Sequence, residues 1–156
     1  MEHIILKTGI RKPLILEIRK NWNMEKQKIA VFLAGRIPSK KNSKQVVFVR
    51  GRRLIIPSKQ YAEWHKVQSR ELITFKNHTF VWGDKKLPLK EVTIEMTITF
   101  PDNRASDLTN KAESVMDLLV DNGILEDDNH KVCKKIVIES GGVDKERAGV
   151  VITINC

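Results

Sequence analysis

The sequence predicts an α+β fold in which a small mixed sheet is combined with two main helices. Two segments have apolar residues at intervals of three and four, whereas several others are short, rich in β-branched residues and bounded by Gly or Pro. No segment is repeated, and 156 residues are enough for one domain with a buried core. We expect residues 29–156 to form this domain and residues 1–28 to be an N-terminal extension. Within this extension, residues 4–18 contain two apolar clusters that fit either a weak hairpin or a segment that docks on a partner.

Six segments have the composition of β-strands. They are residues 29–35, 46–49, 54–56, 92–100, 132–139 and 149–154. The second and third flank Arg50-Gly51-Arg52-Arg53, where Gly51 permits the positive φ of a tight turn, so we expect a hairpin with a basic tip. The last two are expected to form a closing pair joined around Gly141 and Gly142.

The two helical segments are amphipathic. The first spans about residues 58–76, with Ser58 as its N-cap. Its apolar side chains, which recur near the helical period, are Tyr61, Trp64, Val67, Leu72 and Phe75. The second spans about residues 107–121, and Gly123 is expected to cap its C-terminal end. Residues 77–90 show no clear periodicity and are predicted to be a connection.

The composition argues against several classes of protein. The longest apolar runs contain only a few residues, far fewer than the ~20 of a transmembrane helix. The N-terminal segment lacks the apolar run and the cleavage site of a secretory signal, so we expect a cytoplasmic protein. Cys133 and Cys156 have no metal-ligand spacing, which argues against a disulfide scaffold and against a cysteine zinc site.

The net charge of +9 conceals an uneven distribution. Residues 1–90 contain 21 Lys and Arg against 6 Asp and Glu, whereas residues 91–156 contain 7 against 13. A broad basic field favours a polyanion such as nucleic acid, because each neutralised phosphate releases counterions. A membrane surface would use the same field, but no basic amphipathic helix with a bulky apolar face is evident. The remaining interpretation is that these basic residues only keep the protein soluble.

Acidic residues cluster in and after the second helical segment. Its polar residues, at intervals of three and four, are Asp107, Asn110, Glu113, Ser114, Asp117 and Asp121, and the following loop adds Glu126, Asp127 and Asp128. Carboxylate oxygens are the ligands that Mg²⁺ prefers, so the cluster indicates a cation site that activates water for attack on phosphorus. The alternative is that Asp107 caps the helix and the other acids form a solvated face.

The order of these residues resembles a nuclease family. The segments that carry the resemblance are Asp107-Leu108-Thr109-Asn110-Lys111-Ala112-Glu113, Asp117-Leu118-Leu119 and Gly123-Ile124-Leu125-Glu126-Asp127-Asp128. The pattern of that family is D-x-D-N-x-x-K, followed by a helix and then by G-x-x-x-D-D. The loop Pro38-Ser39-Lys40-Lys41-Asn42, the strand end Phe100-Pro101-Asp102 and the later Gly141-Gly142 also fit. Over about residues 29–154, the sequence thus resembles the RusA family of Holliday junction resolvases.

The resemblance implies a RusA-like fold and a homodimeric endonuclease that resolves four-way DNA junctions by paired symmetric nicks, with Mg²⁺ or Mn²⁺ as cofactor. Twofold symmetry suits a substrate with paired strands to cut. By the same resemblance, Asp107 and Asp128 are catalytic and ligate the metal, Asp127 is a further ligand, and Asn110 is the motif asparagine, which we assign to DNA binding.

Two positions depart from the family pattern. Thr109 stands where the family has its second aspartate, and Glu113 stands where it has its catalytic lysine. One interpretation is a junction-binding or DNA-binding protein that has lost its chemistry. The other is a rearranged site, in which Glu113, one turn from Thr109, supplies the missing catalytic carboxylate and metal ligand. Lys111, with Lys40 or Lys41, would then stabilise the charge of the transition state.

Basic residues elsewhere are predicted to contact DNA phosphates, which positions DNA without reading its sequence. They lie in the loop after residue 35 and on the hairpin, and they are Lys40, Lys41, Asn42, Lys44, Arg50, Arg52 and Arg53. A basic protein that binds RNA or a ribosome is a third interpretation of this charge. Tyr61 and Trp64 are expected to pack in the core and not to stack on bases.

Overall fold

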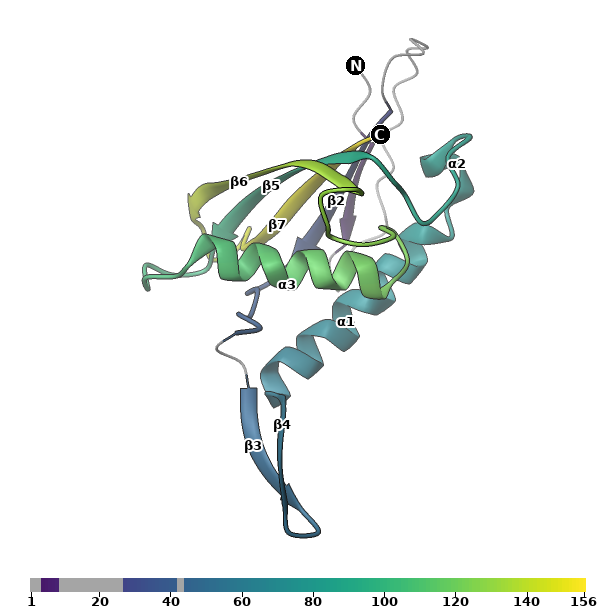
Figure 1. Cartoon of the computed structure of the whole chain (residues 1–156). Helices are drawn as coiled ribbons and strands as arrows, with labels where there is room; N and C mark the ends of the chain where they lie inside the picture. The colour runs from purple at the N-terminus through teal and green to yellow at the C-terminus, as the bar shows by residue number, and fades with distance from the viewer. Residues whose placement is uncertain (1–3, 9–26, 42–43) are drawn as a thin grey trace.

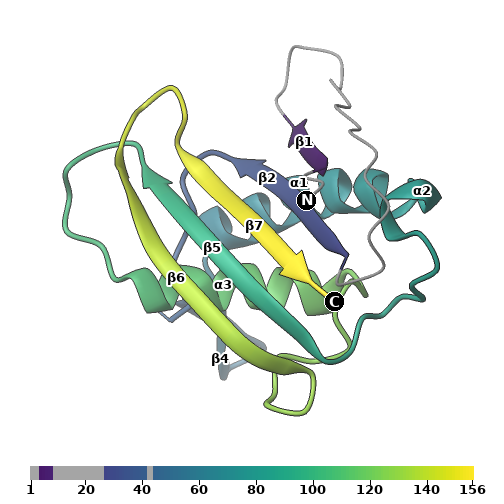
Figure 2. The ribbon, with the colours of Figure 1, turned by 90° about the horizontal axis from the view of Figure 1, so that it is seen from above.

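The structure, a computed structural model, describes residues 4–8, 27–41 and 44–156. Its elements are β1 (Ile4–Thr8), β2 (Lys28–Ala34), β3 (Lys44–Val49), β4 (Arg52–Pro57), α1 (Lys59–Lys76), α2 (Thr79–Trp82), β5 (Val92–Phe100), α3 (Leu108–Asp121), β6 (Cys133–Val143) and β7 (Gly149–Asn155). A five-stranded sheet forms one layer, and α1 and α3 lie together on one of its faces (Figures 1 and 2). The prediction of an α+β fold with a small mixed sheet and two main helices is confirmed.

The sheet has the strand order β1-β2-β7-β5-β6. β7 is antiparallel to both of its neighbours, β2 and β5, whereas β1 is parallel to β2 and β6 is parallel to β5. The predicted closing pair is therefore wrong, because β5 lies between β6 and β7. The side chains of β5 alternate, and those of Val92, Ile94, Met96 and Ile98 are at most 1% exposed. A strand buried in this way needs a neighbouring strand on each edge. On one edge of β5 that neighbour is β6, which continues through Gly141 and Gly142.

The core lies between the sheet and the two helices. On α1 the buried residues are Tyr61, Trp64, Gln68, Leu72 and Phe75. The expectation that Val67 belongs to this stripe is wrong, because its side chain is 37% exposed. Gln68 takes the buried position, where its Nε2 donates a hydrogen bond to the carbonyl of Ala34 at 3.1 Å.

Two other segments complete the body of the molecule. The predicted connection 77–90 contains α2, and Leu89 forms a single bridge to Leu125. The predicted hairpin over residues 4–18 lies mostly outside the described residues, and its described part, Ile4–Thr8, is β1. In the part of the chain that is described, no helix has both the length and the apolar character needed to cross a bilayer.

The predicted hairpin with a basic tip is confirmed by β3 and β4, which pair only with each other. Arg50 and Gly51 form the turn, with φ of 50° and 75°, as a two-residue hairpin turn requires. The hairpin projects from the body next to the start of α1 (Figure 1). Its large apolar side chains are exposed on both faces, and they are Val46, Phe48, Val49, Leu54, Ile55 and Ile56.

Candidate metal and nucleic-acid site

Asp107 is the N-cap residue of α3. Its carboxylate accepts hydrogen bonds from the backbone and hydroxyl of Thr109, at 2.9 and 2.6 Å, and from the side-chain amide of Asn110 at 2.8 Å. The Thr109 hydroxyl and the Asn110 backbone N–H lower the pKa of Asp107, so its carboxylate is ionised at neutral pH. The capping role considered from the sequence is confirmed. Asn110, predicted to bind DNA, donates to Asp107 in this structure.

The acidic face of α3 consists of Glu113, Asp117 and Asp121, which are one turn apart. The first of these pairs with Lys41, whose Nζ lies 2.8 Å from Glu113 Oε1. Glu113, through this hydrogen bond and its charge, raises the pKa of Lys41, and the charge of Asp107 adds a smaller contribution. Lys41 thus interacts with both carboxylates of α3 that the sequence predicts as metal ligands.

The neighbouring Lys40 ties its loop to the middle of α3. Its backbone N–H donates to Ser114 Oγ at 3.0 Å, and Ser114 is fully buried. Its ammonium group pairs with Asp117. On the next turn, His65 of α1 places its Nε2 2.8 Å from Asp121 Oδ2. The acidic face is therefore matched by basic side chains from two other segments and is not simply solvated.

Tyr61 of α1 faces the same helix. Burial, followed by the charges of Asp117 and Asp121, raises the pKa of Tyr61 to about 12, so the phenol is protonated at neutral pH. Its ring lies 5.9 Å from that of Trp64, and both side chains are buried. The prediction that these two aromatic residues pack in the core is confirmed.

The loop after α3 carries a less compensated pair of carboxylates. Asp127 accepts a hydrogen bond from the backbone of Asp128 at 2.8 Å and another from the side chain of Asn129. Burial, together with Asp127 and then Asp117, raises the pKa of Asp128. Among the described residues, no ion pair involves Asp127 or Asp128. Negative charge is therefore crowded at this point of the molecule.

This donor set fits a divalent cation in its chemistry. Mg²⁺ is usually held by one or two carboxylates, with waters completing its shell. Asp127 and Asp128 offer such oxygens, whereas Asp107 and Glu113 interact with Lys41. Within residues 4–8, 27–41 and 44–156, no three His, Cys, Asp or Glu side chains are grouped as a metal site. The predicted ligands thus fall into two sets, linked through the adjacent Lys40 and Lys41.

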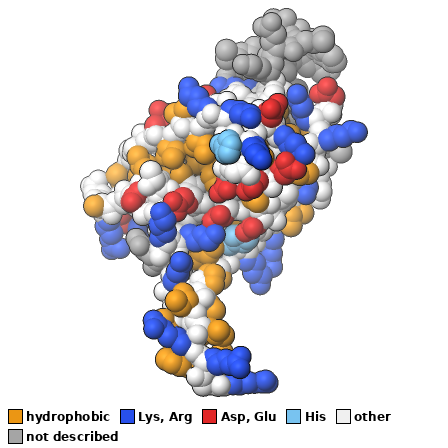
Figure 3. Space-filling view, in the orientation of Figure 1, with side chains coloured by type: hydrophobic (Ala, Val, Ile, Leu, Met, Phe, Trp, Pro, Cys, Tyr) orange, Lys and Arg blue, Asp and Glu red, His pale blue; other side chains and the backbone are white. Residues whose placement is uncertain are grey.

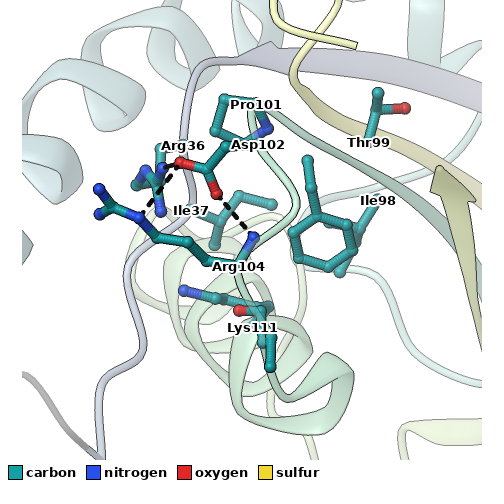
Figure 4. Close-up of a pocket in the computed structure, with 11 residues that line it drawn as sticks. Arg36, Ile37, Ile98, Thr99, Pro101, Asp102, Arg104 and Lys111 are labelled. Atoms are coloured by element: carbon teal, nitrogen blue, oxygen red, sulfur yellow. Dashed lines mark hydrogen bonds and ion pairs between the residues drawn. The ribbon is translucent and has the colours of Figure 1, made fainter. Parts of the chain in front are cut away.

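A recess lies at one edge of the sheet, beside the start of α3 (Figure 4). β2 and β5 run in the same direction because both are antiparallel to β7, so their carboxyl ends share this edge. Arg36 follows β2, Asp102 and Arg104 follow β5, and Asp102 contacts both arginines. Lys111 lines the recess from α3, and burial together with Arg36 lowers its pKa. This predicted catalytic lysine thus has an arginine as a neighbour.

The predicted DNA contacts outside α3 lie on two segments. Lys44 is exposed at the start of β3, and Arg50, Arg52 and Arg53 are exposed at the hairpin tip. Figure 3 shows the hairpin as a projection that carries both basic and apolar side chains. Lys40 and Lys41 are partly engaged with α3, as described above. Asn42 lies outside the described residues.

Two participants, His65 and Arg36, have no role in the sequence prediction, and Asp117 entered it only as part of the acidic cluster and the motif. Asp117 lies one helical turn after Glu113, so the spacing of the acidic residues already pointed to it. The contacts of His65 and Arg36 depend on how α1 packs against α3 and on the strand order, neither of which sequence spacing provides. These two residues become visible only in the folded chain.

Comparison of the sequence with protein-family models and with curated proteins found no match.

We predict that Asp128→Asn raises the melting temperature at pH 7. The raised pKa means that the folded protein holds the Asp128 proton more tightly than the unfolded chain does. The fold therefore loses stability as the pH rises from the ordinary Asp value through this higher one, and the loss persists above it. The amide removes that loss. Thermal unfolding at pH 7 tests this, with Asp84→Asn, at an exposed aspartate next to α2, as the control. An unchanged or lower melting temperature for Asp128→Asn contradicts the prediction.

Proposed function

We propose that this protein is a metal-dependent endodeoxyribonuclease that cuts four-way DNA junctions by paired nicks. The observation that carries the proposal is the unneutralised carboxylate of Asp128, crowded by Asp127 and Asp117 at the end of an acidic helix. Perturbed acids of this kind are concentrated at functional sites. The basic residues of the loop and hairpin supply the surroundings that a polyanionic substrate needs.

Asp127 and Asp128 would hold Mg²⁺ or Mn²⁺ from the loop after α3, and Asp107, which belongs to the other set beside Lys41, would ligate the ion only if the two sets approached each other. When bound, the ion supplies Lewis-acid polarisation of the phosphate and a more acidic water. Asp107 remains ionised for this task because its hydrogen bonds favour the carboxylate. Asp127 is oriented by the backbone of Asp128 and by Asn129.

Lys40 and Lys41 link substrate binding to the proposed metal site. Both are exposed, and each is paired with a carboxylate of the acidic face. A DNA phosphate competes with Asp117 and Glu113 for these ammonium groups, because ion pairs at exposed positions contribute little energy. Transfer of the lysines to DNA would leave these two carboxylates unpaired. Glu113 would then help to hold the cation only when substrate is bound.

A second candidate is a junction-binding protein without nuclease activity. It is favoured by the pairing of Glu113 with Lys41, which puts a lysine where the rearranged site needs a metal. It also accounts for Thr109, whose hydroxyl donates to Asp107 in place of a second carboxylate.

Cleavage of a labelled four-way junction separates the two candidates. With Mg²⁺ we expect symmetric nicks, and with a chelator none. Asp128→Asn is expected to lower the cleavage rate by roughly 100-fold or more, since even outer-shell partners of a metal are worth 10–100-fold. Asp84→Asn, at an exposed aspartate next to α2, is the matched control. Binding without nicks supports the second candidate, and wild-type rates for Glu113→Gln remove Glu113 from the site.

The hairpin arginines are expected to contribute salt-dependent affinity. Replacing Arg52 and Arg53 by Gln is expected to reduce the slope of log affinity against log salt by about 2, roughly one unit per lost phosphate contact. The loss is expected for all sequences alike, because phosphates carry no sequence information. Lys85→Gln with Lys86→Gln, near α2 at the other end of the molecule (Figure 1), is the matched control. An unchanged slope argues against DNA contact by the hairpin.

The proposed homodimer is supported by the apolar surface of the hairpin. Phe48 and Ile55 are 73% and 64% exposed, and exposed apolar patches usually mark interaction surfaces. Replacing both by Ser is expected to convert a dimer to a monomer in sedimentation experiments. Ile73→Ser on α1, where the side chain is 50% exposed, is the control. A wild-type protein that sediments as a monomer contradicts the dimer.

A further inference from the structure

The recess formed by Arg36, Asp102, Arg104 and Lys111 has an excess of positive charge. Arg36 pairs with Asp102 Oδ2, and the Arg104 Nε lies 3.9 Å from the same oxygen. The Arg104 backbone N–H donates to the other oxygen at 3.2 Å. Lys111 adds a third cation, and no ion pair of the described residues involves it. The recess therefore carries three positive side chains and one carboxylate.

This arrangement is costly without an anion. Lys111 is half-buried and lines the recess together with Arg36, so Lys111 has lost part of its water and two cations share one small space. An anion between Lys111 and Arg36 would relieve both effects, because it restores the lost solvation and screens the repulsion. The excess charge thus indicates a missing negative ligand.

The size of the recess limits what that ligand is. About 30 Å³ is open to the centre of a water-sized sphere, whereas a single water needs roughly 10–15 Å³ by this measure. The space suits the oxygens of a small oxyanion and is too small for a nucleobase. Ser106 also lines the recess. Arginine and lysine are the side chains that most often bind phosphate.

The position of the recess connects it with the candidate site. Its lining includes Ser106, the residue immediately before Asp107, and Lys111 on the first turns of α3. A strand whose phosphate lies at Asp107 therefore has another phosphate within reach of the recess.

We propose that this recess binds a backbone phosphate of the DNA strand, next to the phosphate that is cut. The identity of the ligand rests on the proposed function. Asp102 is a positioning residue here, because its Oδ2 contacts both Arg36 and Arg104, whose side chains lie next to each other (Figure 4), and it does not itself contact the phosphate.

The test measures junction affinity in chelator, where no strand is cut. Lys111→Gln is expected to weaken binding about tenfold, as the loss of one charged hydrogen bond does. Lys111→Arg is expected to restore most of the affinity, because it keeps the charge. Lys85→Gln, an exposed lysine near α2, is the control, and thermal unfolding establishes that each variant is folded. Equal affinity of Lys111→Gln and wild type overturns the proposal.

Junctions with single neutral methylphosphonates around the branch point locate the contact. At one position the methylphosphonate is expected to weaken junction binding by the wild-type protein without weakening binding by Lys111→Gln any further. Additive losses at every position overturn the proposal.

Inorganic phosphate identifies the source of the anion. If it shifts the Lys111 side-chain NMR signal while Lys111→Gln leaves DNA affinity unchanged, the recess is a site for free phosphate and the assignment to DNA is wrong. A wild-type protein that shows the Lys111-dependent contact but makes no nicks with Mg²⁺ contradicts the nuclease function and supports phosphate binding by the recess.

Discussion

The site depends on the pairing of the acidic face of α3 with basic side chains from two other segments. Carboxylates one turn apart repel each other, and Lys41, Lys40 and His65 relieve this repulsion on successive turns. The buried hydroxyl of Ser114 adds a neutral hydrogen bond to the backbone of Lys40. The loop after β2 is thus held against α3 by contacts of two kinds, only one of which salt can screen. These contacts act together with the core beneath α1 and α3, which sets the position of the two helices.

Charge is left unbalanced in two places beside this neutralised face. Asp128 lies in an excess of negative charge, and Lys111 lies in an excess of positive charge. A cation and a phosphate are the two ligands that a phosphodiester-cleaving site must bring together. The two unbalanced places have opposite signs, and the ends of α3 separate them along the chain. They would therefore attract these ligands to different points of one surface.

Local sequence patterns were sufficient to predict most of the helices and strands, but they did not predict which elements lie next to each other. Alternation predicted β5, and helical periodicity predicted α1 and α3, because both depend on residues close in the sequence. The sequence pattern placed Val67 in the buried stripe because valine is hydrophobic. The structure instead buries Gln68, whose side chain donates a hydrogen bond to a backbone carbonyl. The motif identified Asp107 and Asp128 as candidates. It gave no indication that Lys41 pairs with Glu113, since that contact joins segments far apart in the chain.

The hairpin is joined to α1 through Ser58 alone, whose hydroxyl accepts a hydrogen bond from the backbone of Tyr61 at 3.2 Å. Such a short, capped junction acts as a stiff coupling and not as a hinge. α1 is itself held in the core by Tyr61, Trp64, Leu72 and Phe75. A partner bound to the hairpin would therefore be kept at a defined position relative to the acidic face of α3.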